Sequence, residues 1–167
     1  MQLHGLIHQF PKEIKALILA FVCVLSIGFY GGLSFVNNTT SMQVNGIETH
    51  YLGNEEDEEA EIMKFKKSER EILTVVHNHI LSLSVIFLLL SLILSTTSIN
   101  KKLKYFLMIE PFLSIILTFG GIYFLWKGFT WVKYIIVISG VFMTLSFVAA
   151  TVSIIYQILA SKKYSSS

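Results

Sequence analysis

The amino-acid sequence predicts an all-α membrane protein, a bundle of four transmembrane helices. Hydrophobic residues make up 53% of the 167 residues and charged residues 14%, whereas a soluble domain carries roughly 25% charged residues. The apolar residues fall into four blocks, over residues 14–36, 72–99, 103–126 and 131–160. Each block can cross about 30 Å of hydrocarbon at about 1.5 Å per residue. We therefore expect a single transmembrane domain over residues 1–167.

The first ten residues predict a short amphipathic helix on the inner leaflet of the membrane. Its apolar side chains share one helical face and its histidines share the other: Leu3, Leu6, Ile7 and Phe10 against His4 and His8. Pro11 then suits the first turn of the following helix. The apolar block that follows exceeds the roughly 7–15 residues of a signal-peptide core, so we expect it to be a span rather than a cleaved signal.

Lysine residues near the helix ends predict that both termini are cytoplasmic, because positive residues gather on that side of a membrane. The lysines before the first span, between the second and third, and after the fourth would share one side: Lys12, Lys15, Lys101, Lys102, Lys104, Lys162 and Lys163. Six basic residues lie on the other side, so the prediction depends on the density of lysine in the short turn at residues 101–104. Residues 37–70 then form an outer loop. Glu55 to Glu61 contains six acidic residues in seven, which is typical of a solvated surface. Ser68 and Glu71 predict a capping box at the start of the second span.

Two histidines, His77 and His79, lie inside the first third of the second apolar block. Ionisable side chains within a span are costly and need a structural or functional reason. Since the two are two residues apart, they point about 200° apart around the helix. His77 shares a polar stripe with Ser84 and Ser91, so we expect it to face the bundle interior. His79 is then expected to face another subunit, the outer surface or a folded-back loop.

The third and fourth blocks predict an antiparallel helical hairpin with an aromatic belt at its turn, residues 126–131. Glu110 lies beside Pro111, about two turns into the third helix. We expect Glu110 to be neutral or hydrogen-bonded, with Gln157 of the fourth helix as a candidate partner. Each span also carries a line of small or polar residues, and we expect these lines to face one another, because small residues let membrane helices approach closely.

The histidines leave several site chemistries open. His50, with His77 or His79 and an acid from Glu48 or residues 55–61, would supply three or four ligands for Zn or Cu. A b-type haem would need two imidazoles. Only the second span contains histidine. The two imidazoles would therefore come from two copies of the chain, or one would come from a partner subunit, or a different side chain would serve as an axial ligand. A hydrogen-bonding imidazole near the headgroups is the structural alternative.

The sequence carries no nucleophile–base pair, P-loop, glycine-rich dinucleotide turn or basic nucleic-acid patch. The single cysteine, Cys23, excludes an intrachain disulfide. We therefore expect a non-enzymatic integral membrane subunit that contacts the lipid bilayer and either other membrane subunits or itself. The alternative is a redox or proton- or ion-translocating protein that uses His77, His79 and Glu110.

Several segments resemble an uncharacterised family of small bacterial four-helix membrane proteins. The resemblance is carried by residues 51–56, 63–69 and 74–79, and again by residues 110–114 and 119–121. It implies a multi-pass protein of the bacterial cytoplasmic (inner) membrane, with His77-Asn78-His79 at the outer start of the second helix. It implies no assigned activity.

Overall fold

The structure is a computed structural model that describes residues 6–55 and 62–160, and the regular structure of these residues is entirely helical. The six α-helices are α1 (Lys12–Thr40), α2 (Val44–Leu52), α3 (Glu69–Ser95), α4 (Lys101–Ile115), α5 (Gly121–Trp126) and α6 (Val132–Ala160). Two further elements are a 3₁₀ turn, η1 (Ile7–Gln9), and a π-helical turn, η2 (Ile116–Gly120), which joins α4 to α5.

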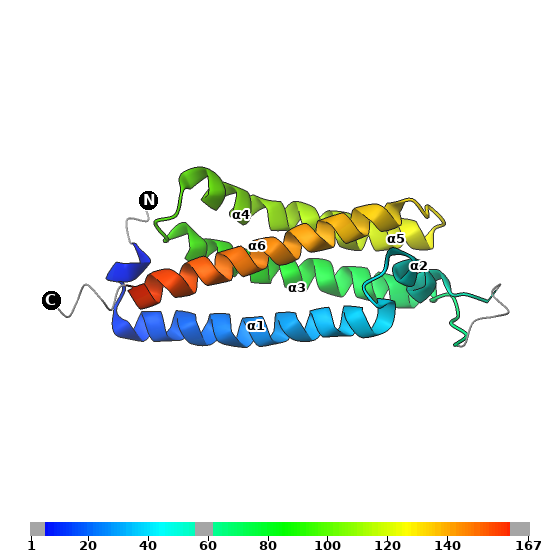
Figure 1. Ribbon diagram of the computed structural model, residues 1–167, viewed down its shortest axis with the longest axis horizontal. Helices are drawn as coiled ribbons and strands as arrows, with labels where there is room; N and C mark the ends of the chain where they lie inside the picture. The colour runs from blue at the N-terminus through cyan, green and yellow to red at the C-terminus, as the bar shows by residue number, and fades with distance from the viewer. Residues whose placement is uncertain (1–5, 56–61, 161–167) are drawn as a thin grey trace.

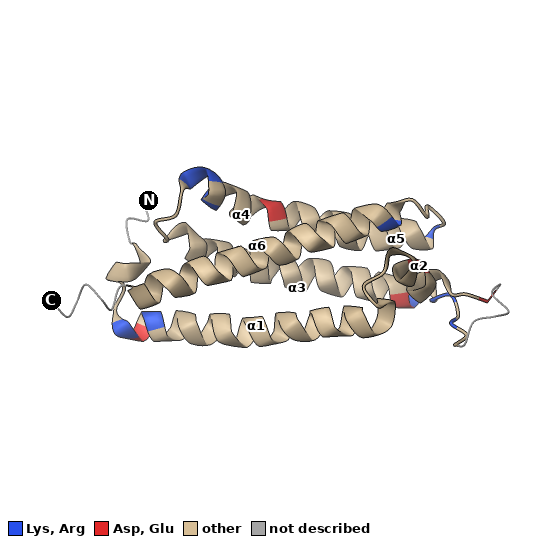
Figure 2. Ribbon diagram, in the orientation of Figure 1, with Lys and Arg blue, Asp and Glu red and all other residues tan. Residues whose placement is uncertain are grey.

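Four long rods run along the same axis: α1, α3, the continuous α4–η2–α5 segment and α6 (Figure 1). All four are long and apolar enough to cross a membrane, so the chain is a multi-pass membrane protein. The short helix α2 lies at one end of the bundle, called here the α2 end. The start of α1 and the end of α6 lie together at the opposite, terminal end (Figure 1). Lysine, arginine and the acidic residues gather at the two ends, apart from one acidic position within α4 (Figure 2).

The hydrophobic core is formed mainly by α3, α4, α5 and α6. In the most apolar stretch of the α4–α5 rod, 44% of the residues are buried. In the corresponding stretch of α1, only 11% of the residues are buried. Helix α1 contributes Ile18 and Val22 to the buried apolar core. It also places the ring of Phe29 on that of Phe147 of α6, with ring centroids 3.9 Å apart. Helix α1 is therefore attached to the bundle along one narrow face.

The small-residue line of α1 does not face the other helices, so that expectation is wrong for this helix. Four residues of that line are exposed, Ala16, Ala20, Cys23 and Gly31, and Ser34 is half-buried. The line lies away from Ile18 and Val22, whose larger side chains pack against the bundle. The pair Gly28 and Gly32 is exposed on another face of the helix. In the α4–α6 pair the expectation is confirmed, because Ser114, Ser139 and Ser146 are buried.

The N-terminal segment is fixed to the terminal end of the bundle. Ile7 is fully buried, and its N–H donates to the backbone carbonyl of Thr96, just after α3, across 2.9 Å. Of the predicted amphipathic helix, the described residues show only the turn Ile7–Gln9. Residues 1–5, including His4, lie outside the described residues.

Helix α2 replaces part of the predicted outer loop. It follows a turn in which Ser41 and Met42 have φ near +50° (53° and 52°). A Cβ at Gly46 would lie 1.9 Å from the carbonyl oxygen of Thr40, so glycine permits the close approach of α2 to the end of α1. The helix is short and of mixed polarity, with Ile47 as its one buried side chain. Such a segment has too weak a periodic pattern for sequence reasoning to identify it.

Candidate functional site

The α2 end is held by polar contacts between segments that are far apart in the sequence. Lys133, near the start of α6, lies 2.5 Å from the carboxylate of Glu48 and 3.1 Å from the side-chain oxygen of Asn45, both on α2. The Lys133–Glu48 pair is mostly buried, with side-chain exposures of 15% and 29%. These contacts fix α2 across the end of α6.

The segment after α2 turns back against the residues that lead into α3. Asn54 donates its backbone N–H to the carbonyl of Lys64 across 2.9 Å and accepts the Lys64 N–H at its side-chain oxygen across 2.6 Å. The backbone N–H of Lys67 donates to the carbonyl of Tyr51 across 3.1 Å. Gly53 permits this return, because its φ is +83° and a Cβ there would lie 2.7 Å from the Lys64 carbonyl oxygen. Residues 56–61, which hold most of the acidic run, lie outside the described residues.

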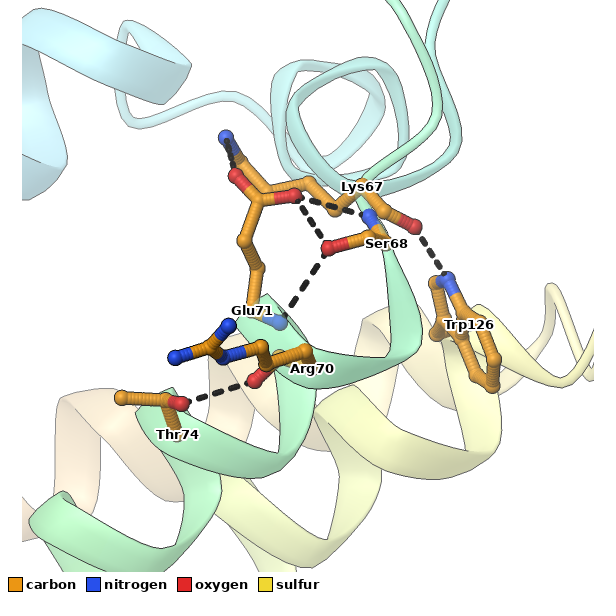
Figure 3. A network of polar contacts seen from close by, with 6 residues as sticks. All are labelled: Lys67, Ser68, Arg70, Glu71, Thr74 and Trp126. Carbon is orange, nitrogen blue, oxygen red and sulfur yellow. Dashed lines mark hydrogen bonds and ion pairs between the residues drawn. The ribbon is translucent and has the colours of Figure 1, made fainter.

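The predicted capping box at the start of α3 is confirmed. The hydroxyl oxygen of Ser68 accepts the backbone N–H of Glu71, and the Glu71 carboxylate accepts the backbone N–H of Ser68 across 2.8 Å (Figure 3). Lys67 reaches the same carboxylate at 3.6 Å. On its other side, the carbonyl of Lys67 accepts a hydrogen bond from the indole nitrogen of Trp126 at 2.7 Å.

His50 is half-buried on α2, and its ring meets that of Tyr51 edge-on, with centroids 4.8 Å apart. Burial lowers the pKa of His50, and the positive charges of Lys67 and Lys64 lower it further. Burial also raises the pKa of Tyr51 to about 12. The imidazole is thus kept neutral, as a metal ligand must be, but the two ammonium groups beside it disfavour a metal cation.

His77 and His79 are both exposed on α3, and the expectation of an inward His77 is wrong. His77 borders a shallow surface depression together with Arg70, Thr74 and Asn78. His79 is the one that contacts the bundle: its ring stacks on Phe119 of η2 with centroids 4.6 Å apart, and its Nδ1 lies 2.8 Å from the carbonyl oxygen of Val75.

The serine stripe misled the prediction because a straight α-helix drifts by about 20° per heptad. Ser84 is half-buried and Ser91 is buried, with its hydroxyl donating to the carbonyl of Met108 across 3.3 Å. Extending the line back from Ser91 to His77 crosses two heptads, and the drift carries His77 out to the lipid-facing surface.

The described residues do not bring the predicted metal ligands into one site. Within residues 6–55 and 62–160, no three histidine, cysteine, aspartate or glutamate side chains come together in a way that could hold a metal ion. The three histidines therefore lie in separate environments. His50 is half-buried on α2, His77 lies on the lipid-facing side of α3, and His79 contacts η2.

Glu110 is hydrogen-bonded, as expected, but Gln157 is not its partner. The Glu110 carboxylate accepts hydrogen bonds from Ser114, one turn along α4, and from Ser146 of α6. Gln157 instead accepts the backbone N–H of Ser98 across 2.8 Å. A second polar contact joins η2 to α6 nearer the α2 end, where the hydroxyls of Thr118 and Ser139 lie 2.7 Å apart.

Comparison with known proteins assigns the larger part of the chain. A family described as a transmembrane helical domain matches residues 41–165. The matched region contains α2 through α6, so α1 lies outside it. No curated protein and no solved structure matches the chain.

Proposed function

Because the chain belongs to this family of transmembrane helical domains, we propose that it is a non-enzymatic membrane subunit that binds other transmembrane helices through α1. The observation that carries the proposal is the open face of α1. This helix lies outside the matched domain, is only 11% buried over its most apolar stretch, and presents its small residues outwards.

The open face is suited to close helix packing. Gly28, Gly31 and Gly32 are exposed, and a Cβ added at any of them would meet nothing within 4 Å. Gly28 and Gly32 are four residues apart, which is the spacing that lets two membrane helices cross with their backbones close together. The simplest occupant of this face is α1 of a second copy.

Site-directed cross-linking tests this proposal. In a Cys23→Ala background, a cysteine replaces either Val24, four residues before Gly28, or Tyr30, which points about 120° away from Val24 on the same helix. The two positions are 70% and 72% exposed, so they form a matched pair. On mild oxidation in membranes, Val24→Cys is expected to give a disulfide-linked dimer and Tyr30→Cys is not.

Adding Gly28→Leu to the Val24→Cys chain is expected to reduce the cross-linked fraction several-fold, because the larger side chain separates the backbones. Equal cross-linking at both positions would indicate random collision. An absence of any dimer at Val24→Cys would remove the second copy as the occupant of α1.

We also propose, following the sequence, that both termini lie in the cytoplasm of a bacterial cell. The lysines gathered at the terminal end of α1 and at the start of α4 support this orientation (Figure 2). A reporter fused to the C-terminus that fluoresces only in the cytoplasm is expected to be active, and a periplasmic alkaline phosphatase fusion inactive. The reverse result would invert the topology.

The second candidate is a histidine-held Zn, Cu or haem b, which would make the protein a redox or proton-translocating subunit with His77, His79 and Glu110. The exposure of His77 supports it. His79 is engaged by Val75 and Phe119, so a His77 from each of two copies is the more accessible ligand pair. Metal analysis and an absorption spectrum of the protein purified from membranes test it. A Soret band or stoichiometric metal that is lost in His77→Ala would support the site.

A further inference from the structure

The lipid-facing side of α3 carries an ordered series of polar and then apolar side chains. Two shallow depressions, of about 800 and 630 Å³, meet at Asn78. Six of the residues along them are called here the α3 face: Arg70, His77, Asn78, Leu81, Ser82 and Val85. Glu69, whose carboxylate is paired with Lys127, also borders the first depression. All six residues of the α3 face are exposed, and they lie outside the helix face that carries Ile72, Phe87 and Leu90 into the core.

Some polar side chains on and beside this face have a hydrogen-bond or ion-pair partner within the chain, and others have none among the described residues. The hydroxyls of Thr74 and Ser82 donate back to the carbonyls of Arg70 and Asn78, across 2.7 and 2.6 Å. The neighbouring Glu69 carboxylate is paired with Lys127 at 3.4 Å. Within the described part of the chain, the side chains of Arg70, His77 and Asn78 have neither a hydrogen bond nor an ion pair. Polar groups at such positions are costly in a bilayer unless something pairs with them.

The order of these groups along α3 matches the layers of a phospholipid leaflet. Arg70 lies in the first turn, and Asn78 is about 12 Å deeper at 1.5 Å per residue. Val85 lies about 10 Å deeper again. This places a cation at the level of the phosphates and apolar side chains at the level of the acyl chains. His77 and Asn78 lie between these levels, and their side chains point back toward the helix N-terminus and so toward the ester linkages.

We propose that the α3 face binds one anionic phospholipid. The Arg70 guanidinium pairs with the lipid phosphate, which it can contact through two parallel N–H groups. His77 and Asn78 donate to the ester oxygens, while Leu81 and Val85 contact an acyl chain. Anionic lipid is favoured over neutral lipid because Arg70 has no carboxylate partner among the described residues.

A second copy of the chain fits this face poorly. Two copies inserted in the same direction can pair only about an axis perpendicular to the membrane, and such an isologous contact sets each residue near itself. Arg70 would then face Arg70 at the rim of the contact, and like charges oppose association. The proposal is independent of the helix-docking role of α1, since α1 contributes no residue to the face.

Native mass spectrometry of the full-length protein with equimolar phosphatidylglycerol and phosphatidylcholine tests the site. The wild type is expected to retain one phosphatidylglycerol in preference to phosphatidylcholine. Arg70→Gln is expected to weaken that retention about tenfold, the scale of one charge-assisted contact. Arg70→Lys should restore part of it. Lys66→Gln removes another exposed cation from the same end and is the matched control, expected to leave retention unchanged.

Four outcomes would overturn the proposal. Equal retention of the two lipids would remove the anionic preference. An equal loss in Lys66→Gln would indicate diffuse surface charge rather than a site. Competition by millimolar inorganic phosphate would indicate a free-anion site. A wild-type dimer that Arg70→Gln dissociates would make the face a protein interface. An unchanged circular dichroism spectrum of Arg70→Gln would show that the variant is folded, so that a loss of bound lipid reports on the site.

Discussion

The indole nitrogen of Trp126 lies 2.7 Å from the carbonyl oxygen of Lys67, and this hydrogen bond joins the last turn of α5 to the residue before the N-cap of α3. The N–H of Lys67 donates to the carbonyl of Tyr51 at the end of α2. Three segments far apart in the chain therefore meet at the backbone of one residue. The arrangement at the α2 end depends on that junction.

Replacing Trp126 with phenylalanine tests the junction. The variant keeps an aromatic ring but leaves the Lys67 carbonyl without its donor, so we expect a loss of about 1–2 kcal/mol in the free energy of unfolding. Thermal unfolding in detergent and hydrogen exchange at the Lys67 and Ser68 amides measure the effect. Trp131→Phe is the matched control, because Trp131 is 61% exposed. An equal loss in both variants would contradict the role of the hydrogen bond.

Gly46→Ala is expected to separate α2 from the end of α1. The added Cβ would lie 1.9 Å from the Thr40 carbonyl oxygen, and the backbone must move to relieve this clash, at a cost of about 1–3 kcal/mol. Increased protease sensitivity near residue 42 and a lower unfolding temperature would report it. Gly140→Ala serves as the control, since a Cβ at that helical position meets nothing within 4 Å. It should be neutral or slightly stabilising.

His50 predicts a pH dependence of the α2 end. Above pH 6.5, the ordinary pKa of the group, the imidazole is neutral in both the folded and unfolded segment, and its pKa in the folded protein is lower. As the pH falls below 6.5, the unfolded segment binds a proton more readily than the folded one, so the stability falls. The loss ends once the pH lies below the lowered pKa of the folded state.

Unfolding temperatures between pH 7.5 and 5.5 measure this effect, and His50→Gln is expected to flatten the profile. The charged groups that act on His50 are Lys64 and Lys67, and they stay protonated throughout this range. A wild-type profile parallel to that of His50→Gln would show that His50 does not titrate in this way.

The Glu110–Ser146 contact predicts measurable coupling between α4 and α6. A double-mutant cycle of Glu110→Leu and Ser146→Ala is expected to give a coupling energy near the average of about 0.6 kcal/mol for hydrogen bonds between membrane helices, and no more than about 1.7 kcal/mol. Glu110→Gln should retain part of it, because its amide oxygen can still accept from Ser146. Ser153→Ala is the control, since the Ser153 hydroxyl donates only to Ala149 within its own helix. Additive single mutants would indicate that the contact contributes nothing.

Features that depend on composition or on short local spacing could be predicted from the sequence. The four long helices follow from apolar blocks that need about 20 residues each. The Ser68–Glu71 capping box follows from a three-residue spacing that fixes both of its hydrogen bonds. Glu110 was identified as a hydrogen-bonded group because an unpaired carboxyl within a span is costly.

Features that depend on the rotation of one helix against another could not be predicted. Whether Glu110 meets Ser146 or Gln157 is decided by how α4 and α6 are turned about their axes, and a helix with apolar residues on all sides leaves that rotation open. The same ambiguity reversed the expected directions of His77 and the small residues of α1. Helix α2 could not be predicted because its short, mixed sequence carries a weak periodic pattern, and its position depends on the close approach of Gly46 to Thr40 and on the long-range Glu48–Lys133 pair.

The π-helical turn at Ile116–Gly120 divides the third span into two α-helical halves whose helical registers are offset from each other. A π-turn closes over five residues, so it accommodates one residue more than the α-helical turn it replaces. Every side chain beyond it, including Trp126, is set back by about 100° relative to an unbroken α-helix of the same sequence. Removing a single residue from this turn would restore a regular α-helical turn with Trp126 still facing Lys67, whereas removing a residue between this turn and Trp126 would rotate Trp126 away from Lys67. In this stretch the fold therefore depends on residue count as much as on residue type.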